Sequence, residues 1–140
     1  MHLNPKNLDF NEINIGDKKE FYKLIKESDI NEFAKMSGDY SSIHMDDDFA
    51  KANGFEGRIA HGALLISWLS RIIGMELPGK KSILVEIKNK FFQPMYINDE
   101  IKISVVVISK SEATKYISLK STCKKNKKII AKGLIGVLIK

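Results

Sequence analysis

Cysteine is almost absent from this sequence of 140 residues, and it contains no long apolar run. The one cysteine, Cys123, excludes an internal disulfide framework and a cysteine-based zinc site, and it fits a reducing compartment. The longest apolar run, residues 63–69, is interrupted by Ser67 and is far shorter than the ~20 residues that cross a bilayer. The first 30 residues carry acidic side chains and no apolar signal-peptide core. We therefore expect a cytoplasmic protein with no membrane-spanning segment.

Several motifs of well-known enzymes are also missing. The sequence contains no H-E-x-x-H, no P-loop, no dinucleotide-binding G-x-G-x-x-G and no G-x-S-x-G. Three histidines without clustered carboxylates or cysteines predict no metal site, and we expect no cofactor. Repeats, low-complexity tracts and linkers are absent as well, so residues 1–140 are expected to form a single domain. A hydrophobic fraction of 44% is ordinary for a globular protein.

Positive charge is concentrated near the end of the sequence. The net charge is +6, and residues 110–140 carry nine lysines against one acidic residue, Glu112. A solvated sheet face with a hairpin tip is the simplest interpretation, and attraction for an acidic partner is the alternative. Tyr116 is the only aromatic residue among these lysines and no recognition motif accompanies them, so no nucleic-acid binding is expected.

The first part of the sequence predicts one strand followed by short helices. Residues 18–25 form the expected strand. The helix after it is expected to begin with Ser28 as its N-cap and to end at Gly38, because glycine is common just past a helix end. A loop over residues 39–45 and a short helix over residues 49–52 are expected to follow.

The second part predicts a buried helix and then four strands. Residues 63–73 are apolar on nearly every face, which is typical of a buried helix, and Gly74 is expected to end it. The alternating segments that follow are 82–92 (with Ile83, Val85, Ile87 and Phe91 on one face), 100–109, 114–123 and 128–139, the last two joined by a turn at 124–127. The pattern predicts an α+β fold in which an antiparallel sheet packs around one helix.

The candidate chemistry lies between these two parts. Asp39 and His44 are five positions apart on the expected loop, which can fold so that both side chains point into one cavity. A carboxylate and an imidazole can hold a water between them and move protons near neutral pH. The alternative is that Asp39 caps a turn and His44 is a satisfied, half-buried imidazole. Spacing alone leaves both interpretations open, because such pairs are common.

The start of the expected central helix offers further candidates. The first N–H groups of a helix have no internal partner, so the N–H of Gly62 is a candidate donor to a developing oxyanion. Gly62 is otherwise only a helix-start glycine. His61 is either a packing residue at the helix entry or part of a binding site. Ser70 either lines a channel or donates back along the helix, and the residues alone favour the second.

Two ordered motifs resemble the MaoC-like family, which includes the (R)-specific enoyl-CoA hydratases and related 3-hydroxyacyl thioester dehydratases. Residues 37–46 read S-G-D-Y-S-S-I-H-M-D and are similar to the family's S-G-D-x-N-P-[LIV]-H-x-D. Residues 59–65 read I-A-H-G-A-L-L and are similar to I-V-H-G-M-L-L. A weaker match, F-F-Q-P-M-Y-I-N-D-E over residues 91–100, is similar to F-x-x-P-V-x-x-G-D-x.

The resemblance implies a hot-dog fold, in which an antiparallel sheet wraps a long central helix, and an assembly at least as large as a homodimer. It implies reversible hydration of a trans-2-enoyl thioester to the (R)-3-hydroxyacyl thioester, carried by CoA or acyl carrier protein. Asp39 and His44 take the places of the family's catalytic pair, and Gly62 that of its oxyanion donor. Ser41, His61 and Ser70 are the expected substrate-binding residues, Ser70 by the weakest match.

One departure from the family keeps other functions open. The family's Asn-Pro, whose asparagine helps to position water and carboxylate, is Ser41-Ser42 here. This change favours a non-catalytic acyl-thioester-binding module or partner subunit as an alternative. A hot-dog thioesterase is less expected, because such enzymes usually place an acidic residue on the central helix and residues 63–73 have none. Asp39, His44 and Gly62 all remain, so catalysis is still expected.

Overall fold

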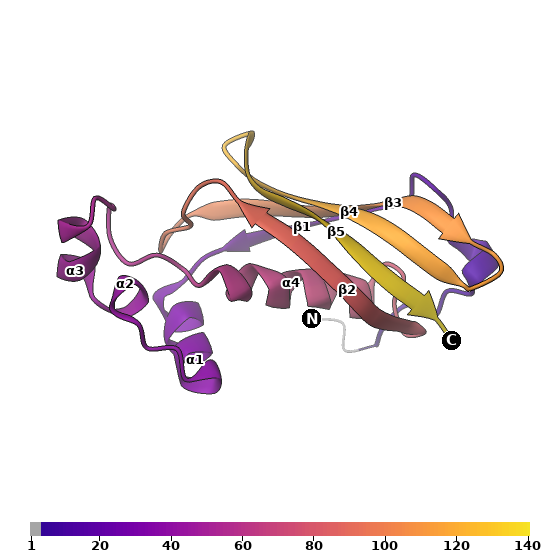
Figure 1. The fold of residues 1–140 in the computed structure, drawn as a ribbon, viewed down its shortest axis with the longest axis horizontal. Helices are drawn as coiled ribbons and strands as arrows, with labels where there is room; N and C mark the ends of the chain where they lie inside the picture. The colour runs from indigo at the N-terminus through magenta and orange to yellow at the C-terminus, as the bar shows by residue number, and fades with distance from the viewer. Residues whose placement is uncertain (1–3) are drawn as a thin grey trace.

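The computed structural model describes residues 4–140 as one sheet with one long helix packed along it (Figure 1). In chain order the elements are η1 (Phe10–Glu12), β1 (Lys18–Leu24), α1 (Glu27–Ser37), α2 (Ser42–Met45), α3 (Asp47–Ala52), α4 (Gly62–Met75), β2 (Ser82–Phe91), β3 (Glu100–Ser111), β4 (Tyr116–Lys125) and β5 (Lys128–Ile139). This order confirms the predicted sequence of strand, helices and four strands. It also confirms the α+β class.

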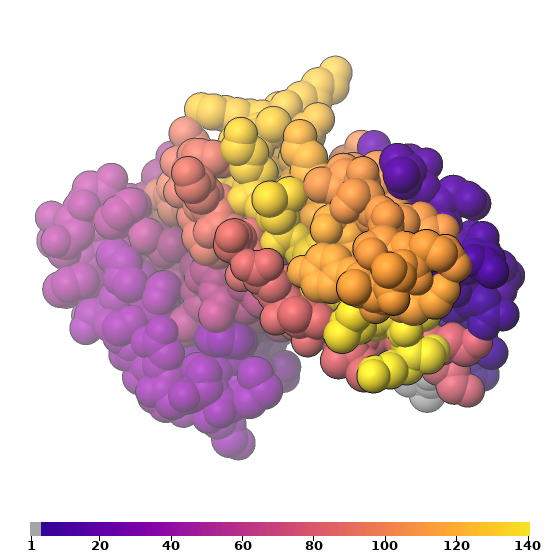
Figure 2. Space-filling model, turned by 45° about the vertical axis from the view of Figure 1, so that its right-hand side comes forward, coloured from indigo at the N-terminus to yellow at the C-terminus, as the bar shows by residue number. Residues whose placement is uncertain are grey.

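The five strands form a single antiparallel sheet in the order β1-β3-β4-β5-β2. The β4–β5 turn contains Asn126 and Lys127, both with positive φ (49° and 67°). Two successive left-handed residues match the right-handed twist of a tight hairpin. This turn projects from the body of the molecule, where Figure 2 draws it in orange-yellow at the top.

The core lies between the sheet and α4. Every second residue of β3 from Ile101 to Val107 is buried, because alternate side chains of a strand point to the same face. They meet the buried stripe of α4 in one hydrophobic cluster, whose members from these two elements are Leu64, Leu65, Leu69, Ile72, Ile73, Ile101, Ile103, Val105 and Val107. The predicted alternation of the third strand is confirmed.

The central helix differs from the prediction at its end and on one face. Gly74 lies inside α4 and does not end it; Glu76 is the C-cap, and Pro78, which cannot continue a helix, follows two residues later. Residues that are exposed on α4 are Ala63, Ser67, Ser70 and Arg71. The helix is therefore covered on one side only within a single chain. No helix in residues 4–140 is long and apolar enough to cross a bilayer.

Strand β2 also differs from its prediction. Its pairing with β5 shifts between Leu84 and Glu86, and such a bulge disturbs the alternation of faces. Ile83 and Val85 are consequently about half exposed (47% and 52%), and Phe91 is 47% exposed. The strand lies at an edge of the sheet, so it leaves apolar surface open beside the exposed face of α4.

The helices before α4 form a separate lobe at one end of the sheet (Figure 1). Ser28 is not the N-cap of α1, contrary to the prediction. The N-cap is Lys26, two residues earlier, and Asp29 caps the first turn by accepting a hydrogen bond from the N–H of Lys26 (2.9 Å). Gly38, at φ 82°, ends α1 as predicted. The predicted loop over residues 39–45 contains the single helical turn α2.

Candidate active site

The ends of α1 and α2 bring Asp39 and His44 together. Asp39 directly follows the left-handed Gly38, which turns the chain sharply, and His44 lies on α2. The Nε2 atom of His44 lies 3.8 Å from Oδ2 of Asp39. The His44 side chain is 16% exposed and that of Asp39 is 48% exposed. Solvent therefore reaches the carboxylate, whereas the imidazole is mostly covered.

Asp39 is held by serines on either side. Its N–H donates to Oγ of Ser37 (3.1 Å), and its Oδ1 accepts from the N–H of Ser41 (3.1 Å). The Ser41 hydroxyl and then the Ser41 N–H hold the pKa of Asp39 below its ordinary value. The imidazoles of His44 and His61 lower this pKa slightly further, and burial opposes them. Asp39 is therefore an ionised carboxylate at neutral pH, able to accept protons and hydrogen bonds.

The backbone of Ile59 fixes the tautomer of His44. The Nδ1 atom of His44 lies 2.7 Å from the carbonyl oxygen of Ile59, which can only accept, so Nδ1 carries the proton. In the neutral ring Nε2 is then an acceptor that faces Asp39. A separation of 3.8 Å is too long for a direct hydrogen bond, but it allows one water to lie within bonding distance of both atoms.

His61 supports this pair from the N-cap of α4. Its ring stacks on His44, with centroids 3.9 Å apart and planes at 26°, and it contacts Phe33 on another side. Its Nε2–H donates to the carbonyl of Asp39 (3.0 Å), and within residues 4–140 its buried Nδ1 has no partner. His61 is only 2% exposed. The geometry gives it a supporting contact, and direct substrate binding by His61 stays a prediction.

Gly62 and His44 line the same cavity. This hollow of about 380 Å³, here called the His44 cavity, is lined by His44, Phe55, Ile59, Ala60, Gly62, Phe91, Phe92, Gln93, Pro94 and Met95. The N–H of Gly62, the first residue of α4, has no acceptor among the described residues. A Cβ at this position would lie 3.1 Å from the ring of Phe91, so a larger residue would press on that ring.

Ser41 and Ser70 lie in different surroundings. Ser41 is in the site through its contacts with Asp39, which supports a positioning role. Ser70 is exposed on α4, does not line the His44 cavity, and its hydroxyl forms no hydrogen bond within residues 4–140. The bond back along the helix that was expected of Ser70 is made by Ser67, whose Oγ donates to Leu64 (2.6 Å).

The residue types also raise the question of a metal. Ligand atoms of Asp39, His44 and His61 lie within 4.8 Å of one another. The two imidazoles, however, are stacked nearly parallel, so their lone pairs run side by side and do not converge on one point. His44 Nδ1 and His61 Nε2 already contact carbonyl oxygens. The arrangement therefore fits proton transfer better than metal coordination.

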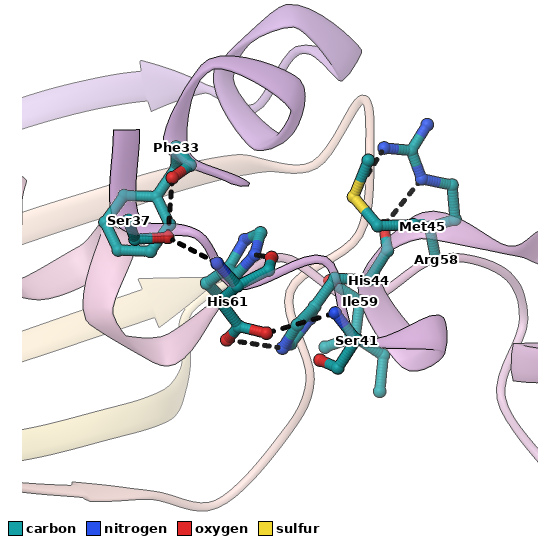
Figure 3. A network of polar contacts seen from close by, with 9 residues as sticks. Phe33, Ser37, Ser41, His44, Met45, Arg58, Ile59 and His61 are labelled. Carbon is teal, nitrogen blue, oxygen red and sulfur yellow. Dashed lines mark hydrogen bonds and ion pairs between the residues drawn. The ribbon is translucent and has the colours of Figure 1, made fainter. Parts of the chain in front are cut away.

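Arg58 is the site residue that the sequence did not reveal. It is 7% exposed and donates from Nε to the carbonyl oxygen of His44 (2.6 Å). Figure 3 shows its side chain reaching the turn that carries His44 and Met45. Its place just before the I-A-H-G motif was the only signal in the sequence.

Comparisons with known proteins find relatives over most of this chain. The family model described as "MaoC like domain" matches residues 10–129. An (R)-specific enoyl-CoA hydratase from Rhodospirillum rubrum is 33% identical over 130 residues, which cover 93% of this chain and 90% of that protein. A mitochondrial 3-hydroxyacyl-[acyl-carrier-protein] dehydratase from Arabidopsis thaliana is 36% identical over 116 residues, or 81% and 69% of the two chains.

The fold is shared with a solved (R)-hydratase from A. caviae involved in PHA biosynthesis. The TM-score is 0.87 at 29% identity, and the match covers 91% of this chain and 98% of the other. This likeness confirms the hot-dog fold that the sequence motifs implied. The family match over residues 10–129 and relatives above 30% identity show that this chain belongs to the MaoC-like domain family.

Proposed function

We propose that this chain catalyses the reversible addition of water to a trans-2-enoyl thioester, which gives the (R)-3-hydroxyacyl thioester. The observation that carries the proposal is the 3.8 Å separation of His44 Nε2 and Asp39 Oδ2, with Gly62 in the cavity that His44 lines. The names of the two relatives describe the two directions of this reaction.

The pair would activate one water molecule. Both Asp39 Oδ2 and His44 Nε2 are acceptors, so a water between them donates both of its protons and directs its lone pairs outward. The water oxygen bonds to C3 of the enoyl group as one of its protons passes to the pair. General acid–base catalysis of this kind contributes on the order of 10²–10⁴-fold.

The electrons displaced from the double bond move toward the thioester oxygen. The free N–H of Gly62 donates to that oxygen, and the positive end of the α4 dipole lies at the same place. One such donor contributes on the order of 10²–10³-fold. The proton taken from water is returned to C2, so one water is added and the pair is restored.

The substrate carrier is the finer part of the proposal. Lys124, Lys125, Lys127 and Lys128, here called the lysine turn, lie at the β4–β5 hairpin. Lys125 and Lys128 line a second cavity of about 350 Å³, which shares Gln93 and Pro94 with the His44 cavity. A projecting basic turn beside the site suits the acidic surface of an acyl carrier protein, in addition to CoA.

The assembly and location follow from other features. We propose a homodimer, because β2 is an edge strand with exposed apolar residues on both faces. We propose the cytoplasm as the location, because Cys123 is a free, buried thiol.

The test compares the wild-type enzyme with Asp39→Asn and His44→Ala in the hydration of crotonyl-CoA. Each variant is expected to lose about 10²–10⁴-fold in kcat with unchanged circular dichroism. Asp48→Asn, an exposed carboxylate on α3, is the matched control and should retain activity. Near-normal rates in both site variants would overturn the proposal.

The same assay separates the two alternatives. Hydrolysis of saturated acyl-CoA without hydration of crotonyl-CoA would indicate a thioesterase. Binding of crotonyl-CoA without turnover would indicate a non-catalytic binding module, the interpretation that Ser41-Ser42 favours.

A further inference from the structure

The turn that carries His44 cannot hold its own position. α2 has only four residues, closed by the bond from the N–H of Asp46 to the carbonyl of Ser42 (2.9 Å). A single helical turn is unstable in isolation, because it fixes several residues for one hydrogen bond. The place of the His44 imidazole therefore depends on contacts from outside α2.

Arg58 supplies several of these contacts at once. Its Nε donates to the carbonyl oxygen of His44 (2.6 Å), and its guanidinium contacts the sulfur of Met45 (3.7 Å). The other end of the guanidinium donates to Glu27 (2.9 Å) and to Oδ1 of Asn31, both on α1. One side chain thus joins the turn that carries His44 to the helix that ends beside Asp39. Figure 3 shows the contacts of Arg58 with His44 and Met45.

The next residue holds the same histidine from another side. The N–H of Ile59 donates to the carbonyl of Ile43 (3.1 Å), and the carbonyl of Ile59 accepts from His44 Nδ1 (2.7 Å). Arg58 itself is anchored through its N–H to Asp47 (2.9 Å). Arg58 directly precedes Ile59, so the position of Arg58 decides where the Ile59 carbonyl oxygen lies that accepts the Nδ1 proton of His44.

The chemistry of the contact requires arginine. Arg58 is 7% exposed, and a buried cation is costly unless its N–H groups have acceptors. Nε and both terminal nitrogens of Arg58 each have an acceptor, in directions set by the planar guanidinium. A lysine ammonium is a point charge on a flexible chain and cannot reach α1 and the His44 carbonyl together.

We propose that Arg58 is a positioning residue for His44. Through Nε and the adjoining Ile59 carbonyl it fixes the imidazole with Nδ1 protonated and Nε2 directed at Asp39. Arg58 touches neither water nor thioester in this role, which rests on the proposed hydratase function.

The first test measures kcat and KM for crotonyl-CoA hydration in Arg58→Lys and Arg58→Ala. A misplaced catalytic group costs on the order of 10²-fold, so kcat should fall by about that factor while KM changes little. Ethylguanidinium should restore part of the kcat of Arg58→Ala, and ethylammonium should not. Arg71→Lys is the matched control, since Arg71 is exposed on α4 and packs over Phe21.

A purely structural role gives a different result. In that case the melting temperature falls, but kcat per folded enzyme stays near wild type and ethylguanidinium has no effect, which would overturn the proposal. If neither Arg58 variant folds, Asn31→Ala keeps the arginine and removes one of its acceptors. It should then lower kcat in the same direction by a smaller factor, and an unchanged kcat would contradict the proposal.

A second readout does not depend on turnover. Nitrogen-15 NMR of wild-type enzyme should show His44 as the Nδ1–H tautomer, and Arg58→Lys should give a mixture of tautomers. If the wild type fails to hydrate crotonyl-CoA but this difference is present, the proposed function fails and the positioning role stands. An identical His44 tautomer in both proteins would remove the positioning role.

Discussion

At the scale of single residues, the acidity of Asp39 is controlled by Ser41. The Ser41 hydroxyl and N–H lower the pKa of Asp39. In Ser41→Ala only the N–H donor remains, and we expect the pKa of Asp39 to rise. Titration of the carboxyl carbon by NMR should give a wild-type pKa of Asp39 below the ordinary value of an aspartate and a higher pKa in the variant.

The sign of the stability effect follows from the direction of this shift. A carboxyl whose pKa is lower in the folded state stabilises the fold above its unfolded pKa, and that contribution is lost as the pH falls through the folded pKa. Ser41→Ala should therefore lower stability at neutral pH and have no such effect in strong acid. Ser42→Ala is the neighbouring control, and an equal shift of Asp39 in both variants would contradict the assignment to Ser41.

The sequence predicted some residues of the candidate site and not others for a physical reason. Asp39, His44 and Gly62 lie in ordered motifs, and their chemistry is evident from residue type. Arg58 and Ile59 act on His44 through carbonyl oxygens, and every residue has a carbonyl oxygen. Only the fold decides which of these oxygens meets which donor, so neither role could be predicted from the sequence.

At the scale of elements, the predicted alternation holds best for strands that bury one face within this chain. β4 and the first eight residues of β3 follow their alternation closely, whereas β2 contains a bulge that no periodicity reveals. The apolar residues of β2 and α4 were recognised from the sequence. Their pattern does not tell whether the same chain or a second chain covers each face of these elements. The predicted burial of α4 on every face and the predicted shared face of the apolar residues of β2 were therefore wrong in part.

The lysine turn is an element with a testable role. Reversal of Lys124, Lys127 and Lys128 to glutamate should raise KM about tenfold for a 3-hydroxyacyl carrier protein at low salt, because attraction between opposite charges is lost. Lys125 is left unchanged, since it pairs with Asp99 (2.8 Å), which also accepts from the N–H of Tyr96. KM for an acyl thioester of N-acetylcysteamine, which lacks the carrier's charge, should not change.

A matched reversal separates local from general electrostatics. Lys80, Lys115 and Lys140 are exposed at the opposite end of the sheet, so their change to glutamate alters the net charge equally. The KM for the 3-hydroxyacyl carrier protein should be the same in this control variant as in the wild type. Equal increases in the two triple variants, or none in either, would remove the lysine turn from carrier binding.

At the scale of the whole molecule, one chain leaves an apolar surface beside its free edge. β2 pairs only with β5 within residues 4–140, and Ile83, Leu84 and Val85 are each about half exposed (47%, 47% and 52%). An unpaired edge strand with exposed apolar side chains is a template for pairing with another strand. A second copy presents the same edge, and antiparallel pairing of the two β2 strands around a twofold axis would satisfy both.

Val85→Lys should convert the expected dimer to a monomer, because it places a charge at the bulge of that edge strand, among its exposed apolar residues. Light scattering coupled to size-exclusion chromatography measures the change directly. Ile108→Lys is the control, since Ile108 is similarly exposed (43%) but lies on β3, which is paired on both sides. A wild-type chain that is monomeric at micromolar concentration, or a Val85→Lys variant that stays dimeric, would show that this edge is not the interface.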